Sequence, residues 1–281
     1  MRSIVFCAAC IICIASFGKA DETVRTWTNT DGKTINASLL SKEGDQVTLR
    51  MTNGRQYTIS LSTLSEADHE YAAAWEAKQA AAAQGEAWGL ELSAPAEAIV
   101  ETAFSTDTPP TRKGEVEGWK AGIGEWRIEE GILIGDEVAE DDHASSLTYQ
   151  FEASHLIIRA EVRLGTATEV AIACRDTVPP SLHLGRLYIT PEKLWIQKMT
   201  GIAGTTKAER LVTEEVEIDP EEWYDVTIEI IGDTYRALVG DHEIEATHER
   251  FLDAKAIIAL VNRGQGAQFR NVSLWHGSPK E

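Results

Sequence analysis

The sequence predicts a mainly β protein: a small β-barrel, an Ala-rich helix, and then an antiparallel β-sandwich of the jelly-roll type. Short stretches in which apolar and polar residues alternate with a period of two recur on both sides of residues 72–85. Turn pairs such as Asp31-Gly32 and Asn53-Gly54 separate the early stretches. Residues 72–85, AAAWEAKQAAAAQG, are the exception, because their composition favours a helix.

The length of the chain indicates how many domains it has, and its charge limits the classes of partner that it can bind. A chain of 281 residues suggests two domains. The formal net charge is −19, with 45 acidic and 26 basic residues. Such a protein repels phosphate backbones, so nucleic acid is excluded as a partner, and binding to an anionic membrane surface is disfavoured for the same reason.

Residues 1–20 have the features of a secretory signal peptide. Arg2 supplies a positive charge, and the apolar run from Ile4 to Ser16 is too short to span a bilayer as a helix. Small residues at Gly18 and Ala20 fit cleavage after Ala20, with an uncleaved anchor as the alternative. We expect a secreted, periplasmic or cell-envelope protein with no membrane association beyond this peptide. Three of the four cysteines of the chain lie in this peptide and leave with it, so the mature chain is expected to have no internal disulfide. The remaining cysteine, Cys174, is expected to be buried and inert.

Residues 24–76 are predicted to form the small barrel. Val47, Leu49 and Met51 fall on one face of a strand, and residues 57–61 repeat the alternation after a tight turn. Residues 65–68, SEAD, form a capping-box start for a helix that follows. Trp27 is either an exposed aromatic anchor for a ligand or part of the barrel core.

This region resembles the first Sla homology domain. The resemblance is carried by residues 25–27 (RTW), 31–33 (DGK), 37–39 (ASL), 47–49 (VTL), 53–55 (NGR), 59–61 (ISL), 64–65 (LS), Asp68 and Tyr71. It implies a Src-homology-like small barrel that binds a protein or peptide.

Residues 77–98 are predicted to be a helical spacer and linker, with a free spacer from Lys78 to Gly85. Residues 99–278 are predicted to form the sandwich. Residues 156–163 and 224–230 alternate strictly, and no convincing helix intervenes. Many short strands with regular turns are typical of a jelly roll of two curved sheets.

The large region resembles the 3-keto-disaccharide hydrolase family, which has the concanavalin-like lectin and glucanase fold. The resemblance covers about residues 104–276 and is carried by Trp119, 124–128 (GEWRI), 131–133 (GIL), 156–163 (LIIRAEVR), 172–175 (IACR), 222–224 (EWY), 240–241 (GD) and 269–272 (FRNV). It implies an acidic residue on the strand that follows Arg175. Residues 183–189, HLGRLYI, contain none, which counts against hydrolysis.

Glycoside hydrolysis requires two carboxylates about 5–10 Å apart. Glu217, Asp219 and Glu222 have the E-x-D-x-x-E spacing of laminarinase-type glucanases and are the weak catalytic candidates. On a strand Glu222 would leave the face shared by the other two, and Pro220 interrupts the ladder. A charged turn is the preferred interpretation.

No metal or cofactor is expected. His242 and His248 are six residues apart, which is not a metal-binding spacing. The acidic loop with Glu137, Glu140, Asp141 and Asp142 could hold calcium, but a lone acidic loop is usually solvated.

An exposed aromatic face with hydrogen-bonding side chains on a concave sheet would suffice for carbohydrate binding. Trp195 is the best candidate because Leu194 and Ile196 point to the opposite side of its strand. Arg175, His183 and Arg186 are expected to line the same surface. The alternative is that Trp195 plugs an edge of the sandwich.

Two functions therefore remain. The first is a secreted adaptor without catalysis, whose barrel binds protein or peptide and whose sandwich binds glycan or protein. The second is a glycoside hydrolase acting on a 3-keto-disaccharide or related oligosaccharide, with the barrel as a docking domain. A purely structural envelope component is also compatible with the sequence.

Overall fold

The computed structural model describes residues 23–176, 183–200 and 207–280. The chain divides into two compact units, residues 1–83 and 84–281. The predicted signal peptide, residues 1–20, lies outside the described residues. In the described part, no helix has the length and hydropathy of a membrane span.

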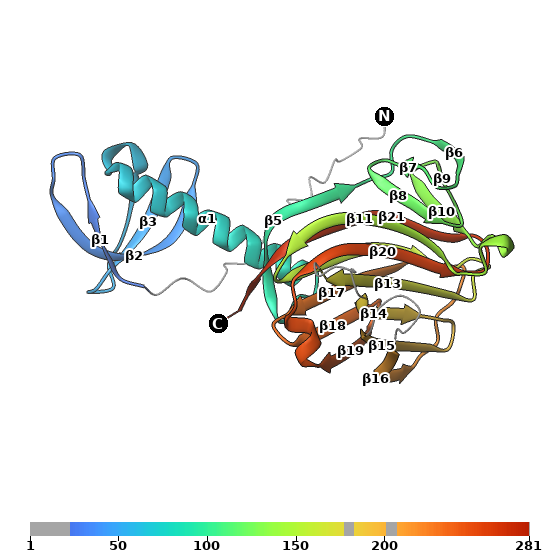
Figure 1. The fold of residues 1–281 in the computed structure, drawn as a ribbon. Helices are drawn as coiled ribbons and strands as arrows, with labels where there is room; N and C mark the ends of the chain where they lie inside the picture. The colour runs from blue at the N-terminus through green and yellow to red at the C-terminus, as the bar shows by residue number, and fades with distance from the viewer. Residues whose placement is uncertain (1–22, 177–182, 201–206, 281) are drawn as a thin grey trace, which may run out of the picture. The chain divides into compact units, whose positions relative to one another are not determined.

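The first unit is a four-stranded antiparallel sheet with a helix (Figure 1). Its strands follow one another in the order β1-β2-β3-β4. Backbone hydrogen bonds from Thr30 to Thr63 and from Ser65 to Thr28 bring the end of the sheet back to β1, which gives the predicted small barrel. Its elements are β1 (Arg25–Thr28), β2 (Thr34–Glu43), β3 (Gln46–Met51), β4 (Gln56–Ser60), the 3-10 helix η1 (Leu61–Thr63) and α1 (Glu66–Ala87).

Trp27 belongs to the core of this unit and is not an exposed ligand anchor. Its side chain is 1 % exposed, and its Nε1 donates to the carbonyl of Ala37 at 3.0 Å. The edge of Tyr71 on α1 packs against the Trp27 ring at 5.6 Å. A barrel this small has few large apolar side chains, so it buries its aromatic ones. The core alternative is therefore correct.

Asp68 fastens the start of α1 to β1. Its carboxylate is buried, pairs with Arg25 at 2.7 Å, and accepts hydrogen bonds from the Thr28 backbone and the Ser65 hydroxyl. This is the residue that the capping-box pattern singled out, and its carboxylate lies in the first turn, where a negative charge is stabilised.

The second unit is a sandwich of two antiparallel sheets. The nine-stranded sheet has the order β19-β18-β17-β12-β21-β10-β9-β6, with β5 also paired to β21. The eight-stranded sheet has the order β16-β15-β14-β13-β20-β11-β8-β7. This is the predicted jelly-roll sandwich.

The predicted alternating strands are present in this unit. Residues 156–163 form β12, and residues 224–230 lie in β17. The strands are β5 (Ser93–Thr102), β6 (Thr108–Thr111), β7 (Glu115–Val116), β8 (Trp119–Ile123), β9 (Glu125–Glu129), β10 (Ile132–Asp136), β11 (Ser145–Ala153), β12 (Leu156–Arg163), β13 (Glu169–Asp176), β14 (His183–Ile189), β15 (Lys193–Thr200), β16 (Lys207–Glu215), β17 (Tyr224–Ile231), β18 (Thr234–Val239), β19 (His242–Thr247), β20 (Lys255–Arg263) and β21 (Ala267–Pro279). The 3-10 helices are η2 (Ala139–Asp141) and η3 (Glu249–Leu252).

The prediction that residues 77–98 form a helical spacer and linker is wrong at the C-terminal end of this range. Strand β5 already begins at Ser93 and pairs with β21, for example Ser93 with Pro279. Residues 77–87 continue α1, whose last residues from Gln84 belong to the second unit. The sequence SAPAEAIV hides β5, because Pro95 and several alanines are unusual in a strand.

The sandwich core lies between the two sheets. Inward side chains of β12, β17 and β21 meet those of β13, β14 and β20 there, and Trp119, Trp126 and Phe269 are fully buried. Cys174 is also buried in this core, and burial raises its pKa to about 12. The thiol is therefore protonated and unreactive, as expected from the sequence.

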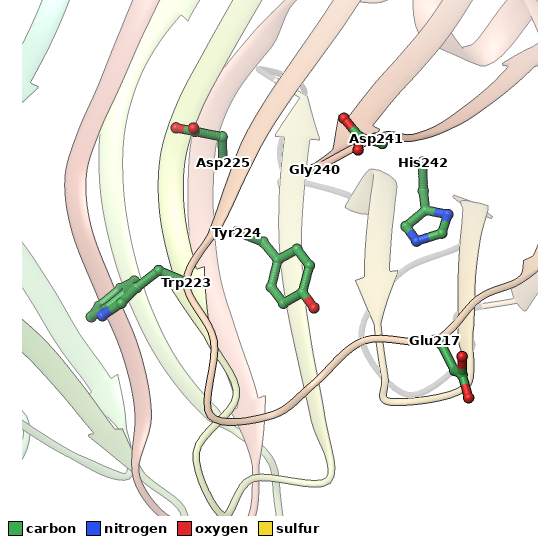
Figure 2. Close-up of a pocket in the computed structure, with 7 residues that line it drawn as sticks. All are labelled: Glu217, Trp223, Tyr224, Asp225, Gly240, Asp241 and His242. Atoms are coloured by element: carbon green, nitrogen blue, oxygen red, sulfur yellow. The ribbon is translucent and has the colours of Figure 1, made fainter.

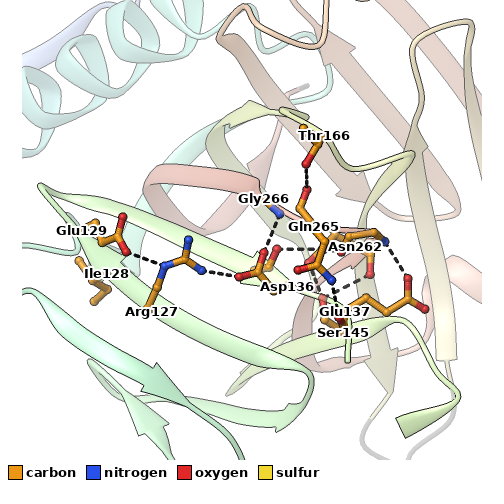
Figure 3. A network of polar contacts seen from close by, with 12 residues as sticks. Arg127, Ile128, Glu129, Asp136, Glu137, Ser145, Thr166, Asn262, Gln265 and Gly266 are labelled. Carbon is orange, nitrogen blue, oxygen red and sulfur yellow. Dashed lines mark hydrogen bonds and ion pairs between the residues drawn. The ribbon is translucent and has the colours of Figure 1, made fainter. Parts of the chain in front are cut away.

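A polar network fixes β10 to the turn between β20 and β21 (Figure 3). Asp136 pairs with Arg127 and accepts the Gly266 N–H at 2.7 Å, and Glu137 accepts the Gly264 N–H at 2.7 Å. These two carboxylates therefore have hydrogen-bonding partners within the described chain.

Candidate functional site

The strand register brings side chains from six strands onto the outer face of the eight-stranded sheet. One row across the sheet is Thr148, Ala259, Ala173, Arg186, Gln197 and Arg210. The adjacent row is Ser146, Val261, Ala171, Tyr188, Trp195 and Thr213. Arg175 and His183 pair in the next row. We call the set Arg175, His183, Arg186, Tyr188, Trp195 and Gln197 the arginine face.

The arginine face contains the four residues of the sandwich that were predicted to bind a ligand: Trp195, Arg175, His183 and Arg186. Side chains alternate between the two faces along β13, β14 and β15. Leu187, Leu194 and Ile196 point into the core, so the four candidates lie on the opposite, outer side of the sheet. Small alanines occupy the central strands of the same face at positions 171, 173 and 259. The longer polar side chains of β14 and β15 stand beside them.

Trp195 does not present its ring face to solvent. Tyr188 stacks on one side, with ring centroids 4.5 Å apart and planes at 9°, and the Arg210 guanidinium lies 4.4 Å from the ring centroid. The side chain is 8 % exposed. The expectation of an open aromatic platform is wrong, because neighbours on β14 and β16 cover the ring. The ring Nε1 is buried and has no hydrogen-bond partner in the described part of the chain.

Hydrogen bonds join four members of the arginine face, namely His183, Arg186, Tyr188 and Gln197. Arg186 donates through Nη1 to the Tyr188 hydroxyl at 3.1 Å and through Nη2 to the His183 ring at 3.0 Å. Gln197 donates to the same Tyr188 oxygen at 3.5 Å. Three donors have no hydrogen-bond partner among the described residues although they are buried: Nε of Arg175, Nε of Arg186 and Nε1 of Trp195. Because buried donors are normally satisfied, each of these three donors lacks a partner that it would ordinarily have.

His183 is neutral at physiological pH. Burial, followed by the charges of Arg186, Arg175 and His143, lowers its pKa to about 3. Its unprotonated ring nitrogen therefore accepts the hydrogen bond from Arg186.

The shift of the His183 pKa predicts an acid-sensitive sandwich. The unfolded chain protonates His183 below about pH 6.5 while the folded chain does not, so its stabilising contribution is present above pH 6.5 and is lost towards pH 3. Between pH 6.5 and 4.5 we expect wild-type stability to fall by about 1–2 kcal/mol more than that of His183→Asn, allowing for partial exposure. Urea denaturation at both pH values measures the difference. Equal losses in the two proteins would contradict the assignment.

Glu169 is a carboxylate on this face that the sequence did not single out. It precedes Ala171 by two positions on β13 and pairs in register with Arg263. Burial raises its pKa, against the attraction of Arg263, Arg186 and Arg210 and with a smaller repulsion from Glu137. The period-two pattern of β13 could have predicted that Glu169 lies on the same face as Ala171. The contact of Arg210 with Trp195 could not be predicted in this way, because a β-bulge between Ile196 and Gln197 shifts the register of β16.

The weak catalytic candidates Glu217, Asp219 and Glu222 lie in the loop between β16 and β17, not on a strand. All three are exposed, and Asp219 caps the following turn by accepting the Glu221 N–H at 2.9 Å. The charged-turn interpretation is therefore correct, and the E-x-D-x-x-E spacing does not place the three on one face.

Glu217 lines a separate pocket of about 440 Å³ with Asp225, Asp241 and His242, which Figure 2 shows. In that view the carboxylates of Glu217 and Asp225 point away from each other. Glu217 and Asp225 therefore do not form the converging pair of carboxylates that glycoside hydrolysis needs (Figure 2).

Metal binding finds no support in the described residues. Across 23–176, 183–200 and 207–280, no group of three His, Cys, Asp or Glu side chains is placed to hold an ion. His248 accepts the Arg250 N–H at 2.9 Å and lies 2.6 Å from Lys198 Nζ. In the acidic loop, Asp141 pairs with Arg112 and accepts the Gly124 N–H, which lowers its pKa.

Solved structures with a similar outline belong to carbohydrate-active proteins. The carbohydrate-binding module CBM66 from Bacillus subtilis has 16 % identity and a TM-score of 0.46, over 56 % of this chain and 95 % of that one. The laminarinase from Rhodothermus marinus has 10 % identity and a TM-score of 0.46, over 66 % and 99 %. At these scores the likenesses say nothing about activity. Among curated proteins, no sequence matches this chain.

The family model is more informative than these structures. The model of the 3-keto-alpha-glucoside-1,2-lyase-like domain matches residues 113–274, which include every strand of the arginine face. This confirms the resemblance of the C-terminal region, while the resemblance of residues 25–75 to the first Sla homology domain stays a prediction. The match spans more than half of the sequence, and the chain belongs to the family of 3-keto-alpha-glucoside-1,2-lyase-like domains.

Proposed function

We propose that this is a secreted or envelope-located binding protein whose sandwich holds a carbohydrate on the arginine face and whose small barrel docks a protein or peptide. The observation that carries the carbohydrate part is the cluster of three buried, unpaired donors of Arg175, Arg186 and Trp195. A sugar offers many acceptor oxygens in a small volume, which suits such a cluster. Membership of a family named for a glucoside lyase supports the same ligand class.

Removing the two arginines is expected to abolish glycan binding by the full chain. Arg175→Gln with Arg186→Gln removes two buried donors and their charge, and each charged hydrogen bond contributes about 1.5–3 kcal/mol, so we expect a loss of at least about 100-fold in affinity. A glycan array followed by calorimetry on the best ligand measures it.

Arg163→Gln is the matched control. Arg163 is also half-buried without an ion pair, but it lies on the nine-stranded sheet, where it contacts Gln268 and Trp223. Binding should be unchanged in this variant. If the wild-type chain binds no glycan, or if the double variant binds as well as wild type, the proposal fails.

Exposed apolar side chains support the docking role of the barrel. Three of the four exposed large hydrophobic residues of the described chain belong to the first unit: Val24, Ile35 and Tyr57, which is 48 % exposed. Single exposed apolar residues are common on protein surfaces, so Tyr57, the largest of the three, is the side chain that would contact a partner. Capture of envelope proteins by the full chain should fall in Tyr57→Ser but persist in the control Thr58→Ser, whose side chain is also exposed.

Cleavage of a keto-glucoside is a second candidate, and Glu169 favours it. Its raised pKa and its place on the arginine face suit a general acid beside positively charged groups. The full chain should then release the leaving group from an aryl 3-keto-α-glucoside, and Glu169→Gln should reduce the rate at least about 100-fold. An acid of raised pKa stops working as pH rises through that pKa, so activity should fall on the alkaline side. Equal rates in wild type and Glu169→Gln would exclude this role.

A further inference from the structure

The two arginines that define the arginine face have no carboxylate of the described chain in ion-pair contact. Arg175 and Arg186 are half-buried, and neither forms an ion pair. Other partly buried arginines of the chain do have carboxylate partners: Arg25 with Asp68, Arg127 with Asp136, Arg159 with Asp225, Arg236 with Glu229 and Arg250 with Asp176. In a chain of net charge −19, acidic side chains are abundant, yet none in the described part forms an ion pair with either arginine. Arg163 on the nine-stranded sheet also has no ion pair among these residues, but its guanidinium donates to Gln268.

Neighbouring groups do not supply the missing negative charge. His183, which contacts Arg186, is neutral, and Tyr188 and Gln197 are uncharged polar partners. Residues 177–182 and 201–206, which lie outside the described part, contain no Asp or Glu in their sequence. Glu169 is attracted by Arg186 and Arg210, but its register partner is Arg263.

Leaving two like charges together and partly desolvated costs free energy. Burial and the charge of Arg186 lower the pKa of Arg175, which shows that its charged form is disfavoured in the free protein. An anion between the two guanidinium groups would remove this cost, and a planar guanidinium matches a carboxylate or sulfate group with two parallel hydrogen bonds.

The covering of the Trp195 ring also favours an anionic ligand. Neutral sugars are usually held by stacking on an open aromatic face, but both faces of the Trp195 ring are occupied, by Tyr188 and Arg210. Recognition at this face therefore depends on donors and charge more than on stacking.

We infer that the arginine face binds an acidic oligosaccharide, with a carboxylate or sulfate group seated between the side chains of Arg175 and Arg186. This inference rests on the proposed function, because it names the class of carbohydrate for the same site.

The test compares three ligands of similar length by calorimetry on the full chain: oligogalacturonate for carboxylate, a carrageenan oligosaccharide for sulfate, and maltohexaose as the neutral ligand. At least one acidic ligand should bind about 10-fold or more tightly than maltohexaose, and added salt should weaken it. Arg186→Gln should remove most of this preference, whereas Arg163→Gln should keep it. The ranking of the two acidic ligands identifies the anionic group.

Each other outcome overturns a stated claim. Equal or tighter binding of maltohexaose overturns the acidic ligand but leaves carbohydrate binding intact. An acidic preference that survives in Arg186→Gln places the anion elsewhere and also overturns the inference. Failure of all three ligands, together with a blank glycan array, overturns the proposed function itself.

Discussion

Glu229→Gln is expected to destabilise the sandwich by about 3 kcal/mol or more, because it removes one partner of a buried ion pair. Glu229 is completely buried on β17 and forms an ion pair with Arg236 at 3.0 Å. Its two oxygens also accept the backbone N–H groups of three successive residues, Glu91, Leu92 and Ser93, at 2.9–3.0 Å. One carboxylate thus holds the segment that leads into β5.

Glutamine keeps the shape of this side chain but offers only one acceptor oxygen and brings two donors towards the backbone N–H groups. Calorimetry of the full chain should show a lower transition temperature for the sandwich. Glu243→Gln is the matched control, since Glu243 pairs with the same Arg236 at 2.8 Å but its side chain is 46 % exposed. We expect it to cost no more than about 1 kcal/mol. Equal losses in the two variants would show that burial of Glu229 is not the cause.

The Glu229 anchor also shows where prediction from the sequence stops. Period-two alternation was enough to predict β12 and β17, because one face of each strand is buried and the other carries polar residues. The same rule places Glu229 on the outer side of β17 and suggests a solvated charge. Its backbone donors lie 136 to 138 residues earlier in the chain, and no local pattern contains that information.

The candidate site was predictable to a similar depth. Alternation correctly put Arg175, Arg186 and Trp195 on one face, because strands β13, β14 and β15 are neighbours in sequence and in the sheet. It did not predict that Arg210 covers the Trp195 ring, since that contact depends on the register of β16. The predicted residues therefore share a face, but the Trp195 ring is covered by Tyr188 and Arg210 instead of open to solvent.

A glycine in the sequence GEWRI, which carried the family resemblance, provides the second large effect. Gly124→Ala is expected to cost at least about 3 kcal/mol. Gly124 has φ +77°, which disfavours any side chain, and an added Cβ would lie 2.4 Å from Ser145 Cβ and 2.7 Å from the Asp136 carbonyl oxygen. Both neighbours are strand residues at the edge of the core, so relief requires the backbone to move.

The control separates the backbone conformation from the close packing at Gly124. Gly232 has φ +57°, and an added Cβ there meets no atom within 4 Å, so Gly232→Ala should cost only about 1 kcal/mol. Urea denaturation of the two variants measures the difference between them, which is the cost of the collision itself. The backbone N–H of Gly124 also donates to Asp141 at 2.8 Å. The backbone movement in Gly124→Ala should therefore weaken the Arg112–Asp141 ion pair as well. Equal destabilisation by the two substitutions would mean that the conformation alone requires a glycine at position 124, and that β8 and β9 tolerate a side chain between them.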